Sequence, residues 1–220
     1  MRHFAEDVAA HFDVNEPLVE IGARAARGQE AEADIRGIFS AEEHIGCDLQ
    51  PGPGVDRIED VHRLTFADNS VGTVVMLDTI EHVADPIRAL EEIHRVLRPG
   101  GLLAMSSVMF FPIHEHPWDF WRFTPQGFAV LLRPFESHLV VSHGYDLLPE
   151  SVFGIGLKGV DRDLSLALLP QTAAACRDWG LHGPVGFGPI RLTVRQLWRE
   201  TARQTGRAMK RRITGRLSAR

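Results

Sequence analysis

The stretch Val71–Val108, VGTVVMLDTIEHVADPIRALEEIHRVLRPGGLLAMSSV, decides the fold of this chain. It opens with a β-branched and aliphatic run, Val71–Leu77, and closes with a second apolar run, Leu102–Val108, and each run predicts a buried strand. Between them, Asp85–Gly101 predicts a helix, because a capping aspartate opens it, Pro86 fits its first turn and two glycines end it. A strand, a helix and a strand in this order are typical of a parallel α/β sheet.

The same alternation extends to both sides of this stretch. Upstream, the patterns predict a short amphipathic helix, a strand, a helix and two strands, at His3–Phe12, Pro17–Gly22, Gly28–Phe39, Glu43–Leu49 and Val55–Ile58. Downstream, they predict a helix and then two strands with no helix between them, at Thr124–Leu132, His138–Gly144 and Ser151–Gly159. We therefore expect an α/β fold: a Rossmann-like, doubly wound, seven-stranded, mostly parallel sheet with an antiparallel edge strand, followed by a C-terminal helical extension.

Composition is that of an ordinary globular protein. Of the 220 residues, 44% are hydrophobic and 24% are charged, and no apolar run approaches the roughly 20 residues that a membrane span needs. The N-terminal residues MRHFAEDVAA lack the apolar core of a signal peptide. Two isolated cysteines, Cys47 and Cys176, make neither a disulfide scaffold nor a zinc site, so we expect a reducing, cytoplasmic location.

Charge is distributed unevenly along the chain. The net charge is −5, yet Ile190–Arg220 holds ten Lys or Arg and one acidic residue, whereas the remainder holds 14 basic and 28 acidic residues. Arginines recur every four residues from Arg191 to Arg211, which predicts a helix with a cationic stripe. We expect one domain over residues 1–160, and a lid or dimer arm with this basic helix over residues 161–220.

The basic tail has several candidate partners. It could dock on the acidic body or on a second subunit in a homodimer, or it could bind an anionic membrane surface. Nucleic acid is not favoured, because the body lacks a basic groove.

Acidic residues lie at or just beyond the ends of three of the expected strands. They are Glu20, Asp48 and the pair Glu59-Asp60, and Gly22 permits a tight turn after the first strand. Ligands of such sheets bind beyond the carboxyl ends of the strands, where the strand order switches, and a carboxylate there can accept two hydrogen bonds from ribose hydroxyls. An NAD(P) site is the rival interpretation, but it requires G-x-G-x-x-G, which this turn lacks.

Four segments, LVEIG, HIGCDL, Ile58–Pro86 and LEEIHRVLRPGGLL, resemble the class I S-adenosylmethionine-dependent methyltransferases, in particular their type 11 domain. The resemblance covers about Pro17–Gly159 and implies S-adenosylmethionine as the cofactor. The first glycine loop departs from the family pattern E/D-x-G-x-G-x-G, because it reads EIGARAARG.

The resemblance implies a set of cofactor-binding residues. Asp48 would hold the ribose hydroxyls, Asp60 would face the adenine amino group, and Arg24 could pair with the cofactor carboxylate. From the methionine end to the loop that closes the site, the full set is Glu20, Gly22, Ala23, Arg24, Asp48, Leu49, Asp60, Val61, Leu77 and Asp78.

Histidines crowd the side on which the methyl acceptor would bind. A neutral imidazole there could take the proton of an acceptor hydroxyl, and such general-base help is worth roughly 10²–10⁴-fold in rate. The catalytic candidates are His82, His114, His116, His143 and Asp119. His114 and His116 could alternatively ligate a divalent metal with Glu115 or Asp119, and this question stays open.

The segment FFPIHEHPWDFWRFTP, Phe110–Pro125, resembles the H-x-P-x-D-x-x-R-F-T-P stretch of type 11 members associated with glycan and polysaccharide biosynthesis. It implies sugar O-methylation, for example of a mannoside or another polysaccharide precursor. Trp118, Trp121 and Arg122 would bind this substrate, although the tryptophans could instead be core anchors. The alternatives are a non-sugar small molecule or RNA as the acceptor, and a non-catalytic module that binds S-adenosylmethionine.

Overall fold

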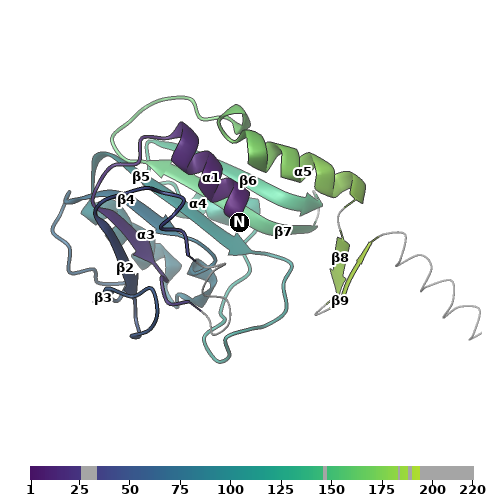
Figure 1. The fold of residues 1–220 in the computed structure, drawn as a ribbon, viewed down its shortest axis with the longest axis horizontal. Coiled ribbons are helices and arrows are strands. Elements are labelled where there is room, and N and C mark those ends of the chain that lie inside the picture. Colours follow the sequence, from purple (N-terminus) through teal and green to yellow (C-terminus); the bar gives the residue numbers. More distant parts are fainter. Residues whose placement is uncertain (26–33, 146–147, 183, 188–189, 194–220) are drawn as a thin grey trace, which may run out of the picture.

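The computed structural model describes residues 1–25, 34–145, 148–182, 184–187 and 190–193. Seven strands of this part form one sheet in the order β3-β2-β1-β4-β5-β7-β6 (Figure 1). Their bounds are β1 (Leu18–Ile21), β2 (His44–Asp48), β3 (Arg57–Ile58), β4 (Val71–Met76), β5 (Leu97–Val108), β6 (Ser137–Tyr145) and β7 (Leu148–Leu157). Strands β1 to β5 pair in parallel, whereas β7 lies between β5 and the edge strand β6 and is antiparallel to both. The predicted doubly wound, mostly parallel sheet is confirmed.

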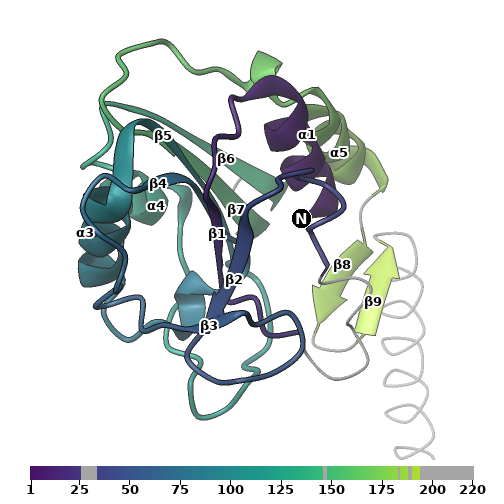
Figure 2. The same ribbon diagram turned by 60° about the vertical axis from the view of Figure 1, so that its left-hand side comes forward.

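Helices cover both faces of the sheet, as Figure 2 shows. On one face, α1 (Arg2–His11) and α5 (Pro170–His182) lie side by side. On the other lie α3 (Pro86–Val96) and α4 (Pro125–Leu131), and the short 3-10 helices are η1 (Ile80–His82) and η2 (Leu166–Leu168). Because both faces are covered, every residue of the central strand β4 is buried.

A buried carboxylate joins α1 to α5. Asp7 has no exposed surface, and it accepts hydrogen bonds from the backbone N–H groups of Gln171 and Thr172 and from the Thr172 hydroxyl. These bonds satisfy the first turn of α5, whose N–H groups have no partner within the helix. The expected division of the chain at residue 160 stays a prediction, and α5 packs on the same face of the sheet as α1.

The third helix is shorter than the sequence predicted. We expected it to run to Gly101, but it ends at Val96, and β5 already begins at Leu97. The reason is Pro99: the residue before a proline is disfavoured in the helical region, and the chain turns extended two residues earlier, with ψ 134° at Leu97. The residues RPGG therefore belong to the strand.

Two other predicted helices are not observed as predicted. One is the helix predicted over Gly28–Phe39, of which residues 28–33 lie outside the described part. Its remaining residues, Asp34–Phe39, form turns instead of a helix, and the Ile38 N–H donates a hydrogen bond to the Ile35 carbonyl. At the start of the basic tail, Ile190–Thr193 form β9, which pairs with β8 (Pro184–Phe187). The rest of the predicted basic helix, residues 194–220, lies outside the described residues.

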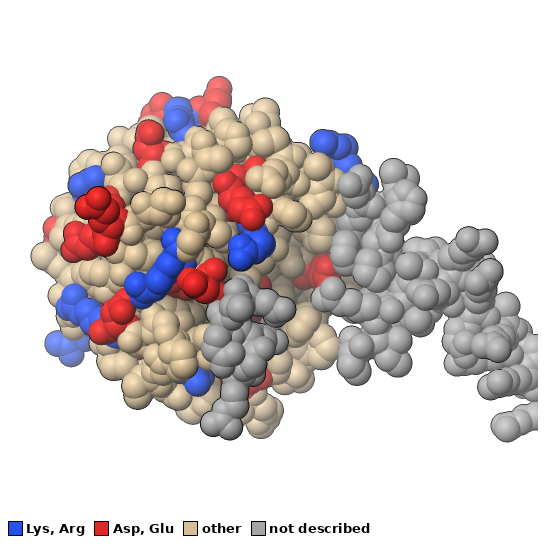
Figure 3. All heavy atoms as spheres, viewed as in Figure 1, with Lys and Arg blue, Asp and Glu red and all other residues tan. Residues whose placement is uncertain are grey.

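The surface of the body mixes both signs of charge. On the face shown in Figure 3, acidic and basic side chains of the described residues are interspersed. The acidic excess of the sequence is thus not gathered into one patch on this face. Within the described part of the chain, no helix combines the length and apolar character that crossing a membrane requires.

A salt-bridge network fastens α3 to the loop between β3 and β4. The Glu92 side chain is only 6% exposed, and it accepts hydrogen bonds from Arg88, from Arg95 and from the Leu64 backbone N–H. Arg95 also donates to two backbone carbonyls of that loop. The Arg95 guanidinium is the main reason that the pKa of Glu92 lies below its usual range.

We predict that Glu92→Gln lowers the free energy of unfolding by about 1.5–3 kcal/mol at pH 7, because hydrogen bonds to a charged group are the ones lost. The folded-state pKa of Glu92 is lower than its unfolded value near 4.5. The contribution of Glu92 is therefore complete above that value and disappears as the pH falls through the folded pKa. Urea denaturation of wild type and variant at several pH values is the measurement.

The matched control is Glu91→Gln. The Glu91 side chain is 57% exposed and pairs with Arg88 at 3.5 Å, so this change should cost less than about 0.5 kcal/mol. Equal destabilisation by the two variants, or a Glu92 effect that does not diminish as the pH is lowered below 4.5, would contradict the prediction.

Candidate active site

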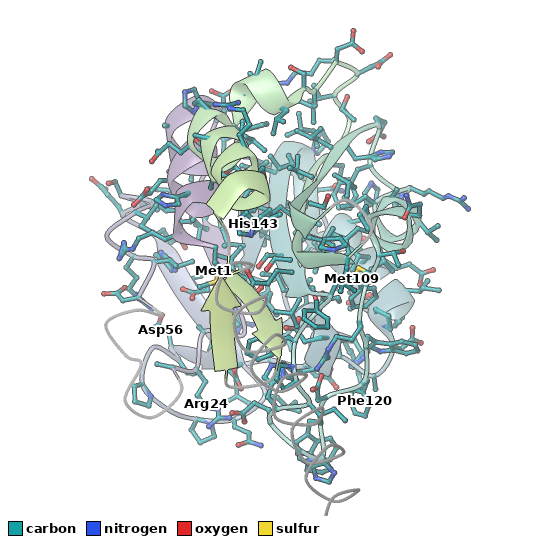
Figure 4. The ribbon with its side chains drawn as sticks, turned by 90° about the vertical axis from the view of Figure 1, so that its right-hand side faces the viewer. Met1, Arg24, Asp56, Met109, Phe120 and His143 are labelled. Carbon is teal, nitrogen blue, oxygen red and sulfur yellow. The ribbon has the colours of Figure 1, made fainter. Side chains whose placement is uncertain are left out.

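The carboxyl ends of β1, β2 and β4 meet at one edge of the sheet. Strand β1 lies between β2 and β4, so the chain runs outward to one side through β2 and β3 and to the other through β4 and β5. Ligands of such sheets bind outside this switch point. Arg24, after β1, and Phe120, in the loop after β5, lie toward the same end of the molecule in Figure 4.

The loop after β1 meets the loop after β4 at Gly22. This glycine has a φ of +83°, in the left-handed region that favours glycine. A Cβ there would overlap Oγ1 of Thr79 and lie 2.6 Å from its Cγ2. Thr79 is itself held, because its hydroxyl donates to the Leu77 carbonyl at 2.8 Å. The tight turn predicted at Gly22 is present, and contact of this turn with a cofactor stays a prediction.

Asp48 ends β2 with a carboxylate that is partly committed. Its Oδ1 accepts from the Gln50 N–H at 2.9 Å and its Oδ2 from the Arg24 N–H at 3.3 Å. Two carboxylate oxygens offer about four acceptor sites, so two further hydrogen bonds, such as those of a ribose diol, can be accommodated. The structure thus leaves Asp48 able to take the role that the sequence predicted.

Arg24 is oriented differently from the prediction. Its Nε lies 3.8 Å from Oδ1 of Asp48, and its side chain lies against Gly52, because the Asp48 carboxylate attracts the guanidinium. Pairing with the cofactor carboxylate would require this side chain to turn. The neighbouring Ala23 is buried, and its N–H donates to the Cys47 carbonyl.

Asp60 and His62 form a short hydrogen-bonded relay after β3. Asp60 accepts from the His62 backbone N–H and from His62 Nδ1, at 2.9 and 2.7 Å, and both bonds hold the pKa of Asp60 below its usual range. His62 Nε2 accepts from the Asp85 N–H at 3.2 Å, so the ring is neutral with its proton on Nδ1. On the same side, Val61 is buried and Leu49 is 66% exposed, which leaves Leu49 free to pack on a flat ring.

Glu20 and Asp78 are both anchored to a neighbouring strand. Oε2 of Glu20 lies 2.8 Å from Nε2 of His44, a side chain of β2 that is only 4% exposed. Asp78, after the half-buried Leu77, has a φ of +44° and accepts from the Ser106 hydroxyl at 2.6 Å. Strand β5 therefore fixes the backbone at the end of β4.

Three potential metal ligands or proton acceptors come together beside this point. One carboxylate oxygen of Glu81 and one ring nitrogen each of His82 and His114 lie within 4.8 Å of one another. Glu81 has no exposed surface, and burial together with the charge of Asp78 raises its pKa to about 7. Its Oε2 accepts from the Ser107 hydroxyl at 2.8 Å, whereas its buried Oε1 has no hydrogen-bond partner among the described residues.

Both imidazoles of this cluster are oriented by oxygen acceptors at Nδ1. His82 Nδ1 lies 2.9 Å from the Trp118 carbonyl, and His114 Nδ1 lies 3.3 Å from the Pro112 carbonyl and 3.2 Å from Asp119 Oδ2. Because these oxygens can only accept, each Nδ1 carries a proton, and in the neutral ring the lone pair is on Nε2. The two rings pack edge to face at 4.7 Å.

An ion pair locks the loop that carries His114. Asp119 accepts two hydrogen bonds from Arg122, at 2.6 and 2.7 Å, and a third from the His114 N–H. The remaining donors of Arg122 bond to backbone carbonyls of the loop, those of Phe111, Pro112 and Trp121.

This geometry changes two predicted roles. The five N–H donors of Arg122 all have partners within the loop, so the guanidinium organises the loop instead of binding substrate hydroxyls. The Asp119 side chain is 1% exposed, and the Arg122 guanidinium holds its pKa far below the usual range. Such a carboxylate is a poor proton acceptor.

The other candidates on the acceptor side are dispersed. His116 is exposed and lies outside the described cluster, in which His114 is grouped with Glu81 and His82 instead of with His116 and Glu115. His143, on β6, lies near Met1 and 3.8 Å from Glu150 (Figure 4). Burial lowers its pKa.

Both tryptophans of the loop show their rings to solvent. Trp118 is 60% exposed, and Trp121 is 42% exposed with its indole N–H donating to the Val83 carbonyl at 2.9 Å. The indole N–H thus anchors one edge of Trp121, while part of its ring stays exposed. The more exposed Trp118 is able to stack on a ligand.

Sequence reasoning did not place the serines of β5 in the site, and it did not group Glu81 with the histidines. The available signal for Glu81 was a charged residue between Ile80 and His82, five residues after the end of the buried strand β4. For the serines, the signal was the pair Ser106-Ser107 at the end of an otherwise apolar strand. A polar group in such a place must find a partner, and here the partners are Glu81 and Asp78.

Residues 9–105 match the family model of the type 11 methyltransferase domain. The matched part contains β1 to β4 and most of β5, with the whole switch point, and it ends before the loop that carries His114. The chain has the Rossmann-like methyltransferase fold. An S-adenosylmethionine-dependent methyltransferase of Thermotoga maritima shares its fold, with a TM-score of 0.53 and 22% identity over 71% of this chain and 89% of that one.

Curated methyltransferases match a part of the chain. A ubiquinone biosynthesis O-methyltransferase of Ruegeria pomeroyi is 27% identical over 68% of this chain and 57% of its own length, and one of Parvibaculum lavamentivorans is 28% identical over 43% and 36%. A ubiquinone/menaquinone C-methyltransferase of Haemophilus ducreyi is 25% identical over 63% and 48%. The chain thus spans between about a third and somewhat more than half of these relatives.

S-adenosylmethionine is the cofactor of this class of domain, and the residues present in the methyltransferase domain fit it. The turn at Gly22 brings the backbone close to the loop after β4, as a ligand cradle requires. Asp48 has acceptor sites for two ribose hydroxyls, and Leu49 offers an exposed apolar side chain for adenine. Asp48, Leu49 and Gly22 would therefore hold it.

We predict that Gly22→Ala destabilises the methyltransferase domain more than Gly100→Ala does. Both glycines have a φ above +80°, so each alanine incurs about 1–2 kcal/mol of left-handed strain. A Cβ at Gly100 has open space, whereas one at Gly22 meets Thr79, which adds about 1–3 kcal/mol of overpacking. Thermal and urea denaturation of the two variants measure the difference, and equal losses would show that the approach of Thr79 is not tight.

We predict that Asp48→Ala weakens binding of S-adenosylhomocysteine at least about tenfold, because each hydrogen bond to a charged group is worth about 1.5–3 kcal/mol. The change should leave the fold intact, since Asp48 is partly exposed at a strand end. Calorimetry measures the affinity. Asp68→Ala, an exposed carboxylate paired with Arg95 outside the switch point, is the control and should bind as wild type does; unchanged affinity in the Asp48 variant would remove this residue from the site.

Proposed function

We propose that the protein transfers a methyl group from S-adenosylmethionine to a hydroxyl oxygen, and that this hydroxyl belongs to a sugar. The observation that carries the proposal is the cluster of Glu81, His82 and His114, because it puts two imidazole lone pairs next to a buried carboxylate beside the cofactor edge. A buried carboxylate oxygen without a hydrogen-bond partner lowers the stability of the fold. A domain that only bound the cofactor would not require it.

The chemistry requires activation of the acceptor. When bound, S-adenosylmethionine supplies an electrophilic methyl group on a positively charged sulfur. The acceptor oxygen forms the new bond to carbon, the carbon–sulfur bond breaks with its electron pair left on sulfur, and the hydroxyl proton must leave. Nε2 of His82 or His114 can accept that proton, or the cluster can hold a cation that acidifies the hydroxyl. The rigid loop does the rest by positioning, which is itself a large part of catalysis.

Exposed aromatic rings next to the cluster support a sugar as the acceptor. Trp118, Phe120 and Trp121 are between 42% and 60% exposed on the same loop as His114, and flat faces of this kind pack on the apolar face of a pyranose. An aliphatic hydroxyl also has a far higher pKa than a phenol, whose pKa is about 10. It therefore needs an activating cluster more than a phenol does. Because Arg122 is fully engaged within the loop, polar contacts to the sugar must come from other groups.

A phenolic acceptor is the second candidate. The observation that favours it is the match to ubiquinone biosynthesis O-methyltransferases over as much as 68% of the chain. The same exposed rings would stack on an aromatic acceptor, and a phenol loses its proton more easily. An assay of S-adenosylhomocysteine release with mannosides and with catechols separates the two candidates, and no turnover on small acceptors would favour RNA or a non-catalytic module.

We predict that His114→Ala and His82→Ala each lower kcat at least about 10²-fold on the true acceptor, because proton removal is lost. Affinity for S-adenosylhomocysteine should stay within a few-fold, since neither imidazole belongs to the switch point. The measurements are steady-state turnover and calorimetry on the same preparations. His138→Ala, on β6 with its ring bonded to the Phe135 carbonyl, is the control for loss of a histidine. Near-normal turnover of both cluster variants would leave methyl transfer to positioning alone.

A further inference from the structure

We propose that Glu81, His82 and His114 form a binding site for one divalent transition-metal ion. Each residue offers a ligand atom, and these atoms lie within 4.8 Å of one another. The residues come from two loops, one after β4 and one after β5, so the site depends on how the sheet brings these loops together. The metal ligands that the sequence left open as an alternative, His114 and His116, are a different set.

The buried oxygen of Glu81 points to a missing positive partner. Glu81 is completely buried, and its Oε1 has no hydrogen-bond partner among the described residues, although Oε2 is held by Ser107. A buried polar atom without a partner is costly, and a buried charge is more so. A cation bound between Glu81 and the two histidines would satisfy this oxygen directly.

The two histidines are already prepared as ligands. In metal sites, the ring nitrogen that does not bind the ion usually donates to a carbonyl or carboxylate, which fixes the ring and leaves the other nitrogen with its lone pair. His82 meets this description through the Trp118 carbonyl, and His114 through the Pro112 carbonyl and Asp119. Arg122 holds Asp119 in place through two hydrogen bonds. Asp119 in turn fixes the orientation of the His114 ring.

The ligand set selects the kind of ion. Two imidazoles and one carboxylate suit Zn²⁺, Fe²⁺, Co²⁺ or Mn²⁺, whereas Mg²⁺ and Ca²⁺ prefer sites made of oxygen. With bonds of about 2.1 Å in a tetrahedral site, ligand atoms lie about 3.4 Å apart, so binding requires any two of these atoms to approach each other by at most about 1.4 Å. Three protein ligands leave at least one position open.

The open position suggests what the ion does. A hydroxyl bound there would lose its proton more easily, because a cation lowers the pKa of a coordinated oxygen. This part of the inference rests on the proposed hydroxyl methylation. Binding of the ion itself does not, and it can be tested without cofactor or acceptor.

The test is titration of the chelator-treated full chain with Zn²⁺ in a calorimeter, and with Co²⁺ followed by its visible absorption. We expect one ion per chain and a higher melting temperature with Zn²⁺ than with Mg²⁺. Because loss of even an orienting neighbour costs about 10–100-fold in metal affinity, Glu81→Gln and His114→Ala should each weaken Zn²⁺ binding by at least that factor. His116→Ala, on the same loop but outside the cluster, is the matched control and should bind Zn²⁺ as wild type does.

Folding of each variant is checked by circular dichroism and by its affinity for S-adenosylhomocysteine, which should be retained. Failure to bind Zn²⁺ or Co²⁺, or equal affinity of wild type and a folded Glu81→Gln variant, overturns the site. Methyl transfer that persists under chelation while the site binds Zn²⁺ supports the site and overturns its catalytic role. Loss of turnover in every variant with no metal bound by wild type overturns the metal site but leaves the proposed methyl transfer standing.

Discussion

The buried residue Glu81 is the constraint on which the acceptor side of this molecule depends. Its carboxylate accepts a hydrogen bond from Ser107 of β5, and its backbone carbonyl accepts from the N–H groups of Phe120 and Trp121. One residue thus ties the end of β4 to β5 and to the loop that follows β5. Burial and the nearby Asp78 raise its pKa to about 7, because both disfavour the charged form.

Rigidity of the loop after β5 follows from a second interaction. Both oxygens of the Asp119 carboxylate and the guanidinium of Arg122 form hydrogen bonds within the loop. Neither side chain is therefore available to bind a ligand. This pair fixes His114 from the backbone and presents Trp118 and Trp121 to solvent on a preorganised frame. Preorganisation of this kind is what positions reacting groups to within a fraction of an ångström.

The two halves of the site differ in how general they are. The half at the switch point, with Gly22 and Asp48, lies inside the region that matches the methyltransferase domain family. The half that carries His114, Trp118 and Trp121 lies beyond it, in the loop between β5 and α4. The predicted cofactor residues thus lie in the part of the chain that matches the family, whereas the candidate acceptor residues of this loop lie outside it.

Sequence patterns alone determined the order of the elements, the doubly wound sheet and the edge at which the cofactor residues gather. They could do so because burial imposes a period on each element, and because carboxyl ends of parallel strands share one edge. Boundaries were less certain, as the early end of α3 at Val96 shows, since Pro99 and the pairing of β5 with β4 compete with helical spacing. Only the tertiary structure decided that Arg122 closes on Asp119 rather than on a ligand, and that His82 joins His114 instead of His116. The physical reason is that hydrogen bonds between loops depend on how the strands bring those loops together. The spacing of residues along the chain does not determine the distance between two such loops.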